Sequence, residues 1–378
     1  MSGFNRRQYI PTYAEFFDAL QCSAVPENFI RSALAKRGII TSSQETREKL
    51  AAYFNKLQPS YDEYQKISEF FVVNSKAKES CSTSKLRDKD NQIDISEVVS
   101  DFKHQLESDP SVLSAIVKKN GVSDEYLIEV QYTVHDYKLS EFQRNQDHST
   151  QFVIANEGGG VLKIQSSGAD KPQKWKKALI SNLEKENQDI DVIDIDLSGI
   201  TDSRKRLKFF DFVPKNINGF ELKNISDVFF AELPEADLSS DDEDSEVIRQ
   251  VPYKIKKAAF RGENLMNSPD LKVLLDQGFH LHRIVWESTR VGDPASSMYL
   301  MQMHFSDAEQ CSGFLYKVLG HKPYENGKYS SKPYPVSKQE EKEITDLILR
   351  AATKGLEEIV AQHRVGAEEQ EDIENGAL

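Results

Sequence analysis

Basic side chains and hydroxyl groups surround the start of a helix expected within residues 29–57. The pattern predicts a basic helix that ends at Gly38, an extended loop, and a second helix over residues 45–57, for which Ser42 and Glu45 have capping-box spacing. Free amide groups at a capped helix N-terminus, flanked by arginine or lysine, bind anions such as phosphate. The residues that we place against a phosphate backbone are Arg31, Lys36, Arg37, Ser42, Ser43, Arg47 and Lys49.

The order of helix, extended loop and helix over residues 29–57 resembles the SAP and HeH type of helix–extended-loop–helix module. Such modules often bind duplex DNA, so the resemblance implies duplex DNA as a partner. It covers these residues alone, and the rest of the chain resembles no family that we recognise. A small helical protein-docking module with a solvated basic face would carry the same pattern, and this alternative stays open.

A second group with chemical potential is Asp211, followed about ten residues later by Glu221 and Lys223. This spacing resembles the core of the PD-(D/E)xK nucleases, in which two carboxylates hold Mg²⁺ and the lysine helps to activate water. The sequence departs from that family because Asp211 lies at the end of a predicted helix, whereas the family places its aspartate on a strand. A metal-dependent nuclease is therefore the enzymatic alternative. The main interpretation assigns no catalytic residue, metal or cofactor.

Histidines and lysines form further clusters. His280 and His282 share one face of a predicted strand, and His304 lies on a neighbouring strand near Cys311, which could make a metal site. Apolar residues share that face, so we favour a structural role. Two basic clusters could contact phosphate, and we expect Trp175, inside the first, to pack inward. The clusters are Lys171, Lys174, Lys176 and Lys177, and Arg204, Lys205, Arg206 and Lys208.

The charge distribution also favours the interpretation that the N-terminal part of this acidic protein contacts nucleic acid. The chain of 378 residues has a formal net charge of -13, but residues 1–58 carry eight basic and five acidic residues. This local charge of +3 leaves -16 for the remainder. An overall acidic chain does not coat nucleic acid with its whole surface, so any contact must be local.

The sequence predicts a cytoplasmic protein. No run of about 18 apolar residues is present, so we expect no membrane association through a spanning helix. The first residues lack the apolar core of a secretory signal. Cys22, Cys81 and Cys311 are isolated from one another and fit free thiols.

We predict an α+β fold in which an N-terminal helical module precedes mixed α+β domains. Residues 74–92 lose all periodicity and are predicted as a linker, and residues 237–246 hold six acids in ten positions. The expected division is a helical module over 1–73, the linker over 74–92, a central α+β domain over 93–235, an acidic linker over 236–247, a C-terminal α+β domain over 248–365 and an acidic tail over 366–378.

Within these domains the periodicity predicts the following elements. Helices are expected over residues 95–106, 112–119, 172–186, 202–213, 268–277, 307–319 and 337–363. Strands are expected over residues 126–132, 151–155, 161–165, 191–197, 251–261, 280–287 and 298–305, with a hairpin-like segment over 219–233.

Together these features predict a non-enzymatic, DNA-associating accessory subunit or sensor that acts with a protein partner or as a homo-oligomer. By analogy, such a modular chain suits prokaryotic DNA transactions or antiviral defence against phage. The alternatives are the PD-(D/E)xK-like nuclease and a protein–protein interaction scaffold that does not bind nucleic acid.

Overall fold

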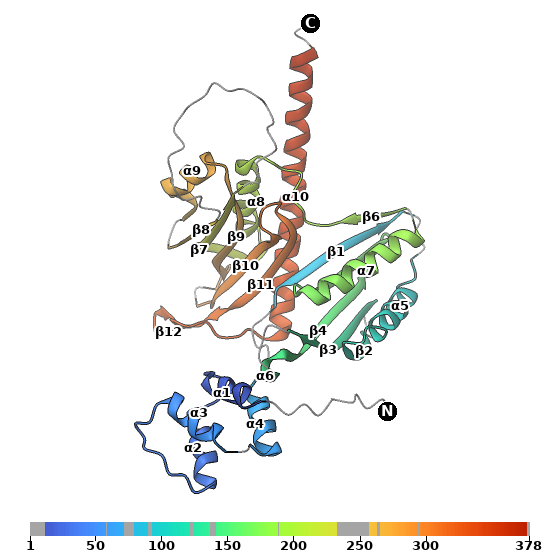
Figure 1. Ribbon diagram of the computed structural model, residues 1–378. Helices are drawn as coiled ribbons and strands as arrows, with labels where there is room; N and C mark the ends of the chain where they lie inside the picture. Colours follow the sequence, from blue (N-terminus) through green and yellow to red (C-terminus); the bar gives the residue numbers. More distant parts are fainter. Residues whose placement is uncertain are drawn as a thin grey trace, which may run out of the picture. The chain divides into compact units, whose positions relative to one another are not determined.

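The chain folds into two compact units that interleave along the sequence. The computed structural model describes residues 12–57, 59–71, 79–89, 93–120, 124–136, 141–187, 189–232, 257–262, 265–293 and 295–375. Unit one comprises residues 1–77, 99–118 and 127–151, and unit two comprises residues 78–98, 119–126 and 152–378. Helices accompany a large antiparallel sheet, which confirms the predicted α+β class (Figure 1).

Unit one begins with four helices, which lie in the segment predicted as a helical module over residues 1–73. It contains α1 (Tyr13–Gln21), α2 (Glu27–Lys36), α3 (Arg47–Asn55), α4 (Tyr61–Phe71) and the short α6 (Glu141–Arg144). Thr12 caps α1 in a full capping box with Glu15. The cap predicted at Ser42 is wrong, because Thr46 accepts the hydrogen bond that caps α3, from the amide of Lys49. The helix therefore begins at Arg47.

The core of the helical part of unit one includes a residue from far along the sequence. Phe142 on α6 is 6% exposed and lies among the buried residues of α1 to α4. Its ring centroid is 5.1 Å from that of Phe16, 5.3 Å from that of Tyr64 and 6.1 Å from that of Phe71. The predicted module boundary at residue 73 thus cuts through this core.

The remaining elements form the rest of unit one, which includes most of α5, and the whole of unit two. They are β1 (Cys81–Asp88), α5 (Ile95–Glu107), β2 (Val112–Asn120), β3 (Glu125–His135), β4 (Asn145–Asn156), β5 (Val161–Ser167), α7 (Asp170–Glu186), β6 (Ile190–Ile193), α8 (Ser203–Lys215), β7 (Phe220–Glu232), β8 (Lys257–Arg261), η1 (Leu265–Asn267), α9 (Pro269–Asp276), β9 (Phe279–Arg290), β10 (Met298–Asp307), β11 (Ser312–Lys322), β12 (Tyr324–Glu325), β13 (Lys328–Tyr329) and α10 (Lys338–Asn375).

The sheet of unit two is antiparallel throughout its described pairs. Its strand order is β5-β1-β11-β10-β9-β7-β8, and β6 also pairs with β1. The two strands predicted over residues 151–155 and 161–165 are confirmed and form a hairpin, because β4 and β5 pair from Val153↔Gln165 to Asn156↔Leu162. Helix α7 packs on β5, and Trp175 points inward as predicted, with its ring 6.4 Å from that of Phe152.

Helices α8 and α10 cover the apolar face of the sheet in unit two. Apolar positions along α10 recur every three or four residues, from Ile344 through Ile348 and Ala352 to Ile359, and all are buried. Gly355 lies where α10 crosses α8, because a Cβ atom there would be 2.9 Å from Cδ1 of Phe212. Within the described residues, no helix combines the length and the apolar character needed to cross a membrane.

The linker predicted over residues 74–92 is wrong for residues 81–88, which form the internal strand β1. The polar composition of this segment led to the wrong prediction. The strand can be buried because its hydroxyl groups form hydrogen bonds inside the protein. Nζ of Lys176 donates to Oγ of Ser82 at 2.6 Å, and Oγ1 of Thr83 lies 2.8 Å from the hydroxyl of Tyr316. Lys176, expected to be solvated in a basic cluster, is 4% exposed.

Three further predictions of elements need correction. Residues 112–119 form strand β2 and not a helix, in keeping with the β-branched Val112, Ile116 and Val117. The hairpin expected over residues 219–233 is wrong, because residues 220–232 form one long strand, β7. Strand β6 ends at Ile193, short of the predicted residue 197. The acidic segment 237–246 lies outside the described residues.

The helix predicted over residues 307–319 is a turn followed by strand β11. The side chain of Asp307 accepts from the amides of Glu309 and Gln310 at 3.0 and 2.9 Å, which closes the turn. Cys311 then adopts a positive φ of 55°. The alternation of Phe314, Tyr316 and Val318 toward the core is a strand pattern that the sequence reading missed.

Truncating Phe142 tests its place in the helical core of unit one. We expect Phe142→Ala to destabilise α1 to α4 by about 3 kcal/mol, because it removes a buried ring and its aromatic contacts. Hydrogen exchange of the amides in these helices should accelerate, while amides of β9 to β11 keep their protection. Unchanged exchange in α1 to α4 would show that Phe142 is dispensable.

The buried ammonium of Lys176 predicts a pH-dependent stability. Burial lowers the pKa of Lys176 from 10.5 to about 8. Between these two pH values the unfolded chain binds the proton more strongly, so this lysine opposes folding fully below pH 8 and progressively less as the pH rises. We therefore expect the unfolding free energy of the native protein, relative to Lys176→Met, to rise by about 2 kcal/mol from about pH 7 to about pH 10.

Paired urea denaturations of the native protein and Lys176→Met at the two pH values measure this difference. Lys174→Met is the matched control, because Lys174 is exposed on the same helix and does not act on the pKa of Lys176. A pH-independent difference for Lys176→Met would mean that the ammonium is solvated in the folded protein.

Candidate functional site

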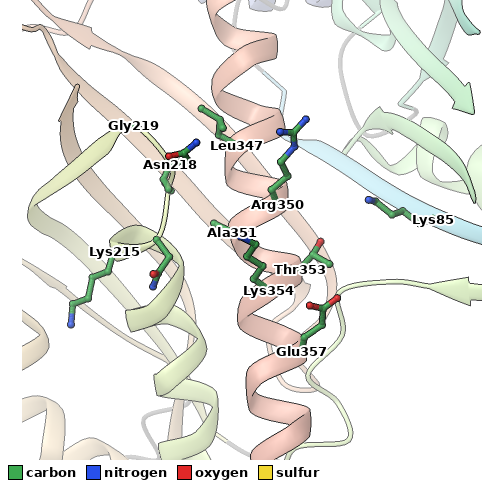
Figure 2. Close-up of a pocket in the computed structure, with 12 residues that line it drawn as sticks. Lys85, Lys215, Asn218, Gly219, Leu347, Arg350, Ala351, Thr353, Lys354 and Glu357 are labelled. Atoms are coloured by element: carbon green, nitrogen blue, oxygen red, sulfur yellow. The ribbon is translucent and has the colours of Figure 1, made fainter. Parts of the chain in front are cut away.

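A groove of about 670 Å³ in unit two gathers basic and amide side chains from three elements (Figure 2). Strand β1 contributes Lys85, and Figure 2 shows this side chain pointing toward α10. The end of α8 and the turn into β7 contribute residues 215–219. Helix α10 contributes Leu347, Arg350, Ala351, Thr353, Lys354 and Glu357.

Local sequence explains how each wall is built. Helix α8 ends at Lys215, where the side-chain amide of Asn216 donates to the carbonyl of Phe212 at 2.8 Å and satisfies a free end of the helix. Gly219 has a φ of 76°, a left-handed conformation that glycine adopts without steric cost, so the chain can turn directly into β7. On α10, Arg350 and Lys354 lie opposite the buried apolar stripe.

The cations of the groove divide into paired and unpaired side chains. Nζ of Lys85 is 2.7 Å from Oε2 of Glu157, and Nζ of Lys215 is 2.6 Å from Oδ2 of Asp211. Arg350 and Lys354 are both exposed, and neither forms an ion pair with a described residue. They lie four residues apart, which is about 6 Å along α10 and places them next to each other on one face of the helix. Two adjacent cations are thus available to an external anion.

This arrangement suits binding to phosphate oxygens. The guanidinium of Arg350 can offer two parallel donors, and the ammonium of Lys354 adds a compact positive charge beside it. Asn218, exposed in the facing turn, adds amide hydrogen-bonding capacity. Glu357 is the carboxylate in the lining and sets one end of the positive region. No local sequence motif predicts this site. The one indication in the sequence is that Arg350 and Lys354 lie four residues apart on a predicted helix.

In unit one, two arginines predicted to contact DNA are engaged with the backbone of the protein. Nη1 of Arg47 donates to the carbonyls of Leu20, Cys22 and Val25 at 2.9, 2.8 and 2.8 Å. The guanidinium of Arg31 donates to Oγ1 of Thr41 at 3.3 Å and to the carbonyl of Glu45 at 2.9 Å. Both side chains therefore fix the loops between helices.

The other residues predicted to contact DNA are exposed. Arg37 forms an ion pair with Glu63, and Nζ of Lys49 lies 3.3 Å from Glu45. Lys36 is exposed and forms no ion pair with a described residue, so it is the cation of this set most available to a ligand. Ser42 and Ser43 are exposed in the loop before α3.

The residues of the nuclease alternative lie on two different elements. Asp211 lies within α8, where it pairs with Lys215. Glu221 and Lys223 lie on β7 and pair with each other at 2.6 Å. Across the described part of the chain, no group of three or more His, Cys, Asp and Glu side chains is placed to hold a metal ion.

The remaining clusters are tied to the fold. Nε2 of His280 lies 2.7 Å from the carbonyl oxygen of Ala308, and Cys311 is a buried free thiol. Arg206 is 1% exposed and donates to the carbonyls of Ile200, Glu309 and Gln310 at 2.6, 3.3 and 3.2 Å.

No protein-family model matches the chain, and a search of curated proteins finds no match.

The contacts of Arg47 predict which cations of unit one are structural. We expect Arg47→Gln to destabilise α1 to α3 by about 2 kcal/mol, because three carbonyls lose a charged donor. Lys36→Gln should change stability by less than about 0.5 kcal/mol, since an exposed lysine without an ion pair contributes little. Hydrogen exchange in α1 to α3 measures both, and equal stability of the two variants would contradict the structural role of Arg47.

Proposed function

We propose that this protein is a non-enzymatic, DNA-associating accessory subunit or sensor, and that the groove beside α10 holds part of the phosphate backbone. The observation that carries the proposal is the exposed pair Arg350 and Lys354, which faces a groove lined by amides and further cations. Contacts of this kind bind the backbone of DNA without reading its sequence.

The charge of the whole protein limits how strong this association can be. A net charge of -13 opposes a polyanion at long range, so the contact must lie in a local positive region. Repulsion between exposed charges is screened beyond about 8 Å at physiological ionic strength, which lets a local groove act against the overall charge. We therefore propose weak binding without strong sequence preference, strengthened by a protein partner or by self-association.

Lys36 and the exposed hydroxyls before α3 are the part of unit one that best fits a role beside DNA. In this proposal they add phosphate contacts, while Arg31 and Arg47 keep the loops in place. The proposal thus uses fewer residues of unit one than the helix–extended-loop–helix resemblance implies.

Reversing the charge of the α10 pair tests the proposal. We expect the full-length protein to bind duplex DNA at low salt, about 50 mM, and R350E/K354E to lose most of this binding. Removing two phosphate contacts should also reduce the slope of log affinity against log salt by about 2. Fluorescence anisotropy of labelled duplexes of unrelated sequence, over a salt series, measures both quantities.

The matched control is K272E/K338E, which makes the same change in net charge at two exposed lysines on α9 and at the start of α10. Because neither lysine lines the groove, its binding should stay within a few-fold of the native protein. If both double variants lose binding equally, only net charge matters and the groove is not the site. Absence of binding by the native protein at low salt would instead favour the interaction scaffold.

A further inference from the structure

Strand β2 lies at the end of the strand order and has β3 as its neighbour (Figure 1). The amide of Thr133 on β3 donates to the carbonyl of Ser111 at 2.9 Å, immediately before β2 begins. Backbone groups of successive residues in a strand face opposite sides, so those of Ser114, Ile116 and Lys118 are turned away from β3. No strand in the described part of the chain pairs with this outer edge of β2.

The side chains along this edge are largely apolar and partly exposed. Leu113 is 51% exposed and Ile116 is 52% exposed. Charged residues and prolines protect most open edges from pairing with other chains. Residues 112–117 contain no charge, proline or glycine, and β2 carries lysines only near its end, at Lys118 and Lys119. The first six residues of β2 are therefore suited to pairing with a further strand.

We infer that β2 pairs with β2 of a second copy of this chain, in antiparallel orientation about a two-fold axis. Such an interface is self-complementary, because each copy supplies the same groups to the other. With the axis at Ala115, Ser114 of one copy lies opposite Ile116 of the second copy, and their outward backbone groups can exchange two hydrogen bonds. Leu113 then lies opposite Val117, so apolar side chains meet across the interface.

The charges at the two ends of β2 favour the antiparallel orientation. The acidic residues Glu107 and Asp109 precede the strand, whereas Lys118 and Lys119 lie near its end. Antiparallel pairing brings the acidic start of one copy toward the basic end of the other, and parallel pairing would place the lysines of both copies side by side. Both lysines already form ion pairs within the chain. Charge therefore selects the orientation, while the backbone and apolar contacts supply the affinity.

The small size of the interface sets the expected strength of the dimer. A single pair of strands buries less surface than the roughly 1,200 Å² at which stable interfaces begin, so the dimer should dissociate on dilution. The inference does not depend on DNA association. A dimer would nevertheless carry two copies of the groove beside α10, and two grooves on one DNA molecule would bind it more tightly than one.

The oligomeric state of the full-length protein, measured without DNA, tests the inference. Sedimentation equilibrium from about 1 µM to about 200 µM should show a reversible equilibrium between monomer and dimer, because this range brackets weak association. Ile116→Lys should weaken dimerisation at least about tenfold, since it places a lysine in each copy at the centre of the contact. Val273→Lys makes the same change at a valine of α9 that is 53% exposed, and it should dimerise as the native protein does.

Ser114→Pro tests the backbone pairing directly. Proline has no amide hydrogen, and the amide of Ser114 is turned away from β3, so the change removes a donor at the interface and leaves the pairing with β3 in place. We expect a monomer whose circular dichroism spectrum matches that of the native protein. If Ser114→Pro does not fold, Ile116→Lys still decides the question, because it changes an exposed side chain alone.

A cysteine at the proposed axis tests the register. Ala115→Cys should form a reducible disulfide dimer beyond any formed by the native protein, because the same residue of both copies meets at the axis. Ser331→Cys, exposed in the segment before α10, is the matched control and should not.

A native protein that stays monomeric over the whole concentration range overturns the inference and leaves the edge to a strand of a different protein. A dimer that Ile116→Lys and Ser114→Pro both leave unchanged also overturns it, since the contact then lies elsewhere. Neither result bears on the groove beside α10, because no DNA is present in these measurements.

Discussion

The close crossing of α8 and α10 at Gly355 is the constraint on which the arrangement of unit two depends. A side chain at this position would meet Cδ1 of Phe212 at 2.9 Å and atoms of Phe209 and Val213 at 3.5 Å. Because glycine permits this contact, the two helices lie together over the apolar face of the sheet. The same contact holds the end of α8, and the turn from Lys215 to Gly219, beside the exposed face of α10. Packing in the core therefore determines where the groove lies. Its basic residues occupy the faces of α10 and of the turn after α8 that do not pack in the core.

The protein uses many of its cations internally, and this explains why basic clusters in its sequence are poor guides to its ligands. Arg47 and Arg206 each donate to three backbone carbonyls at turns and so satisfy polar groups that the turns leave exposed. Lys176 is buried against Ser82 inside the sheet, at a cost in stability that its lowered pKa records. A cation is free to bind a ligand where the fold does not require it, as at Arg350, and sequence alone does not separate these cases.

Periodicity predicted the elements whose apolar residues mark one face strongly, and it failed where polar residues are buried. The helices α7 and α8 and the strands β9 and β10 lie close to their expected bounds, because Leu, Ile and Phe repeat along one face of each. Helix α10 begins where it was expected, but it continues to Asn375, so the acidic tail predicted over residues 366–378 is wrong for residues 366–375. Strand β1 was missed because Ser82 and Thr83 are satisfied by residues far away in the sequence. Strand β11 was missed because its first turn, closed by Asp307, resembles a helix start. The groove could not be predicted as a whole, since Lys85 and Arg350 meet only after β1 has been placed in the sheet.

The exposure of Arg350 and Lys354 to water decides which kind of contact the groove can make. Solvated cations lose little hydration in a contact with a long polyanion, and mobile ions screen that contact strongly. Salt should therefore weaken the binding that we propose for the groove. Screening is much weaker for a buried cation such as Arg206, whose guanidinium donates to backbone carbonyls. Salt dependence thus distinguishes the cations that bind a ligand from those that stabilise the fold.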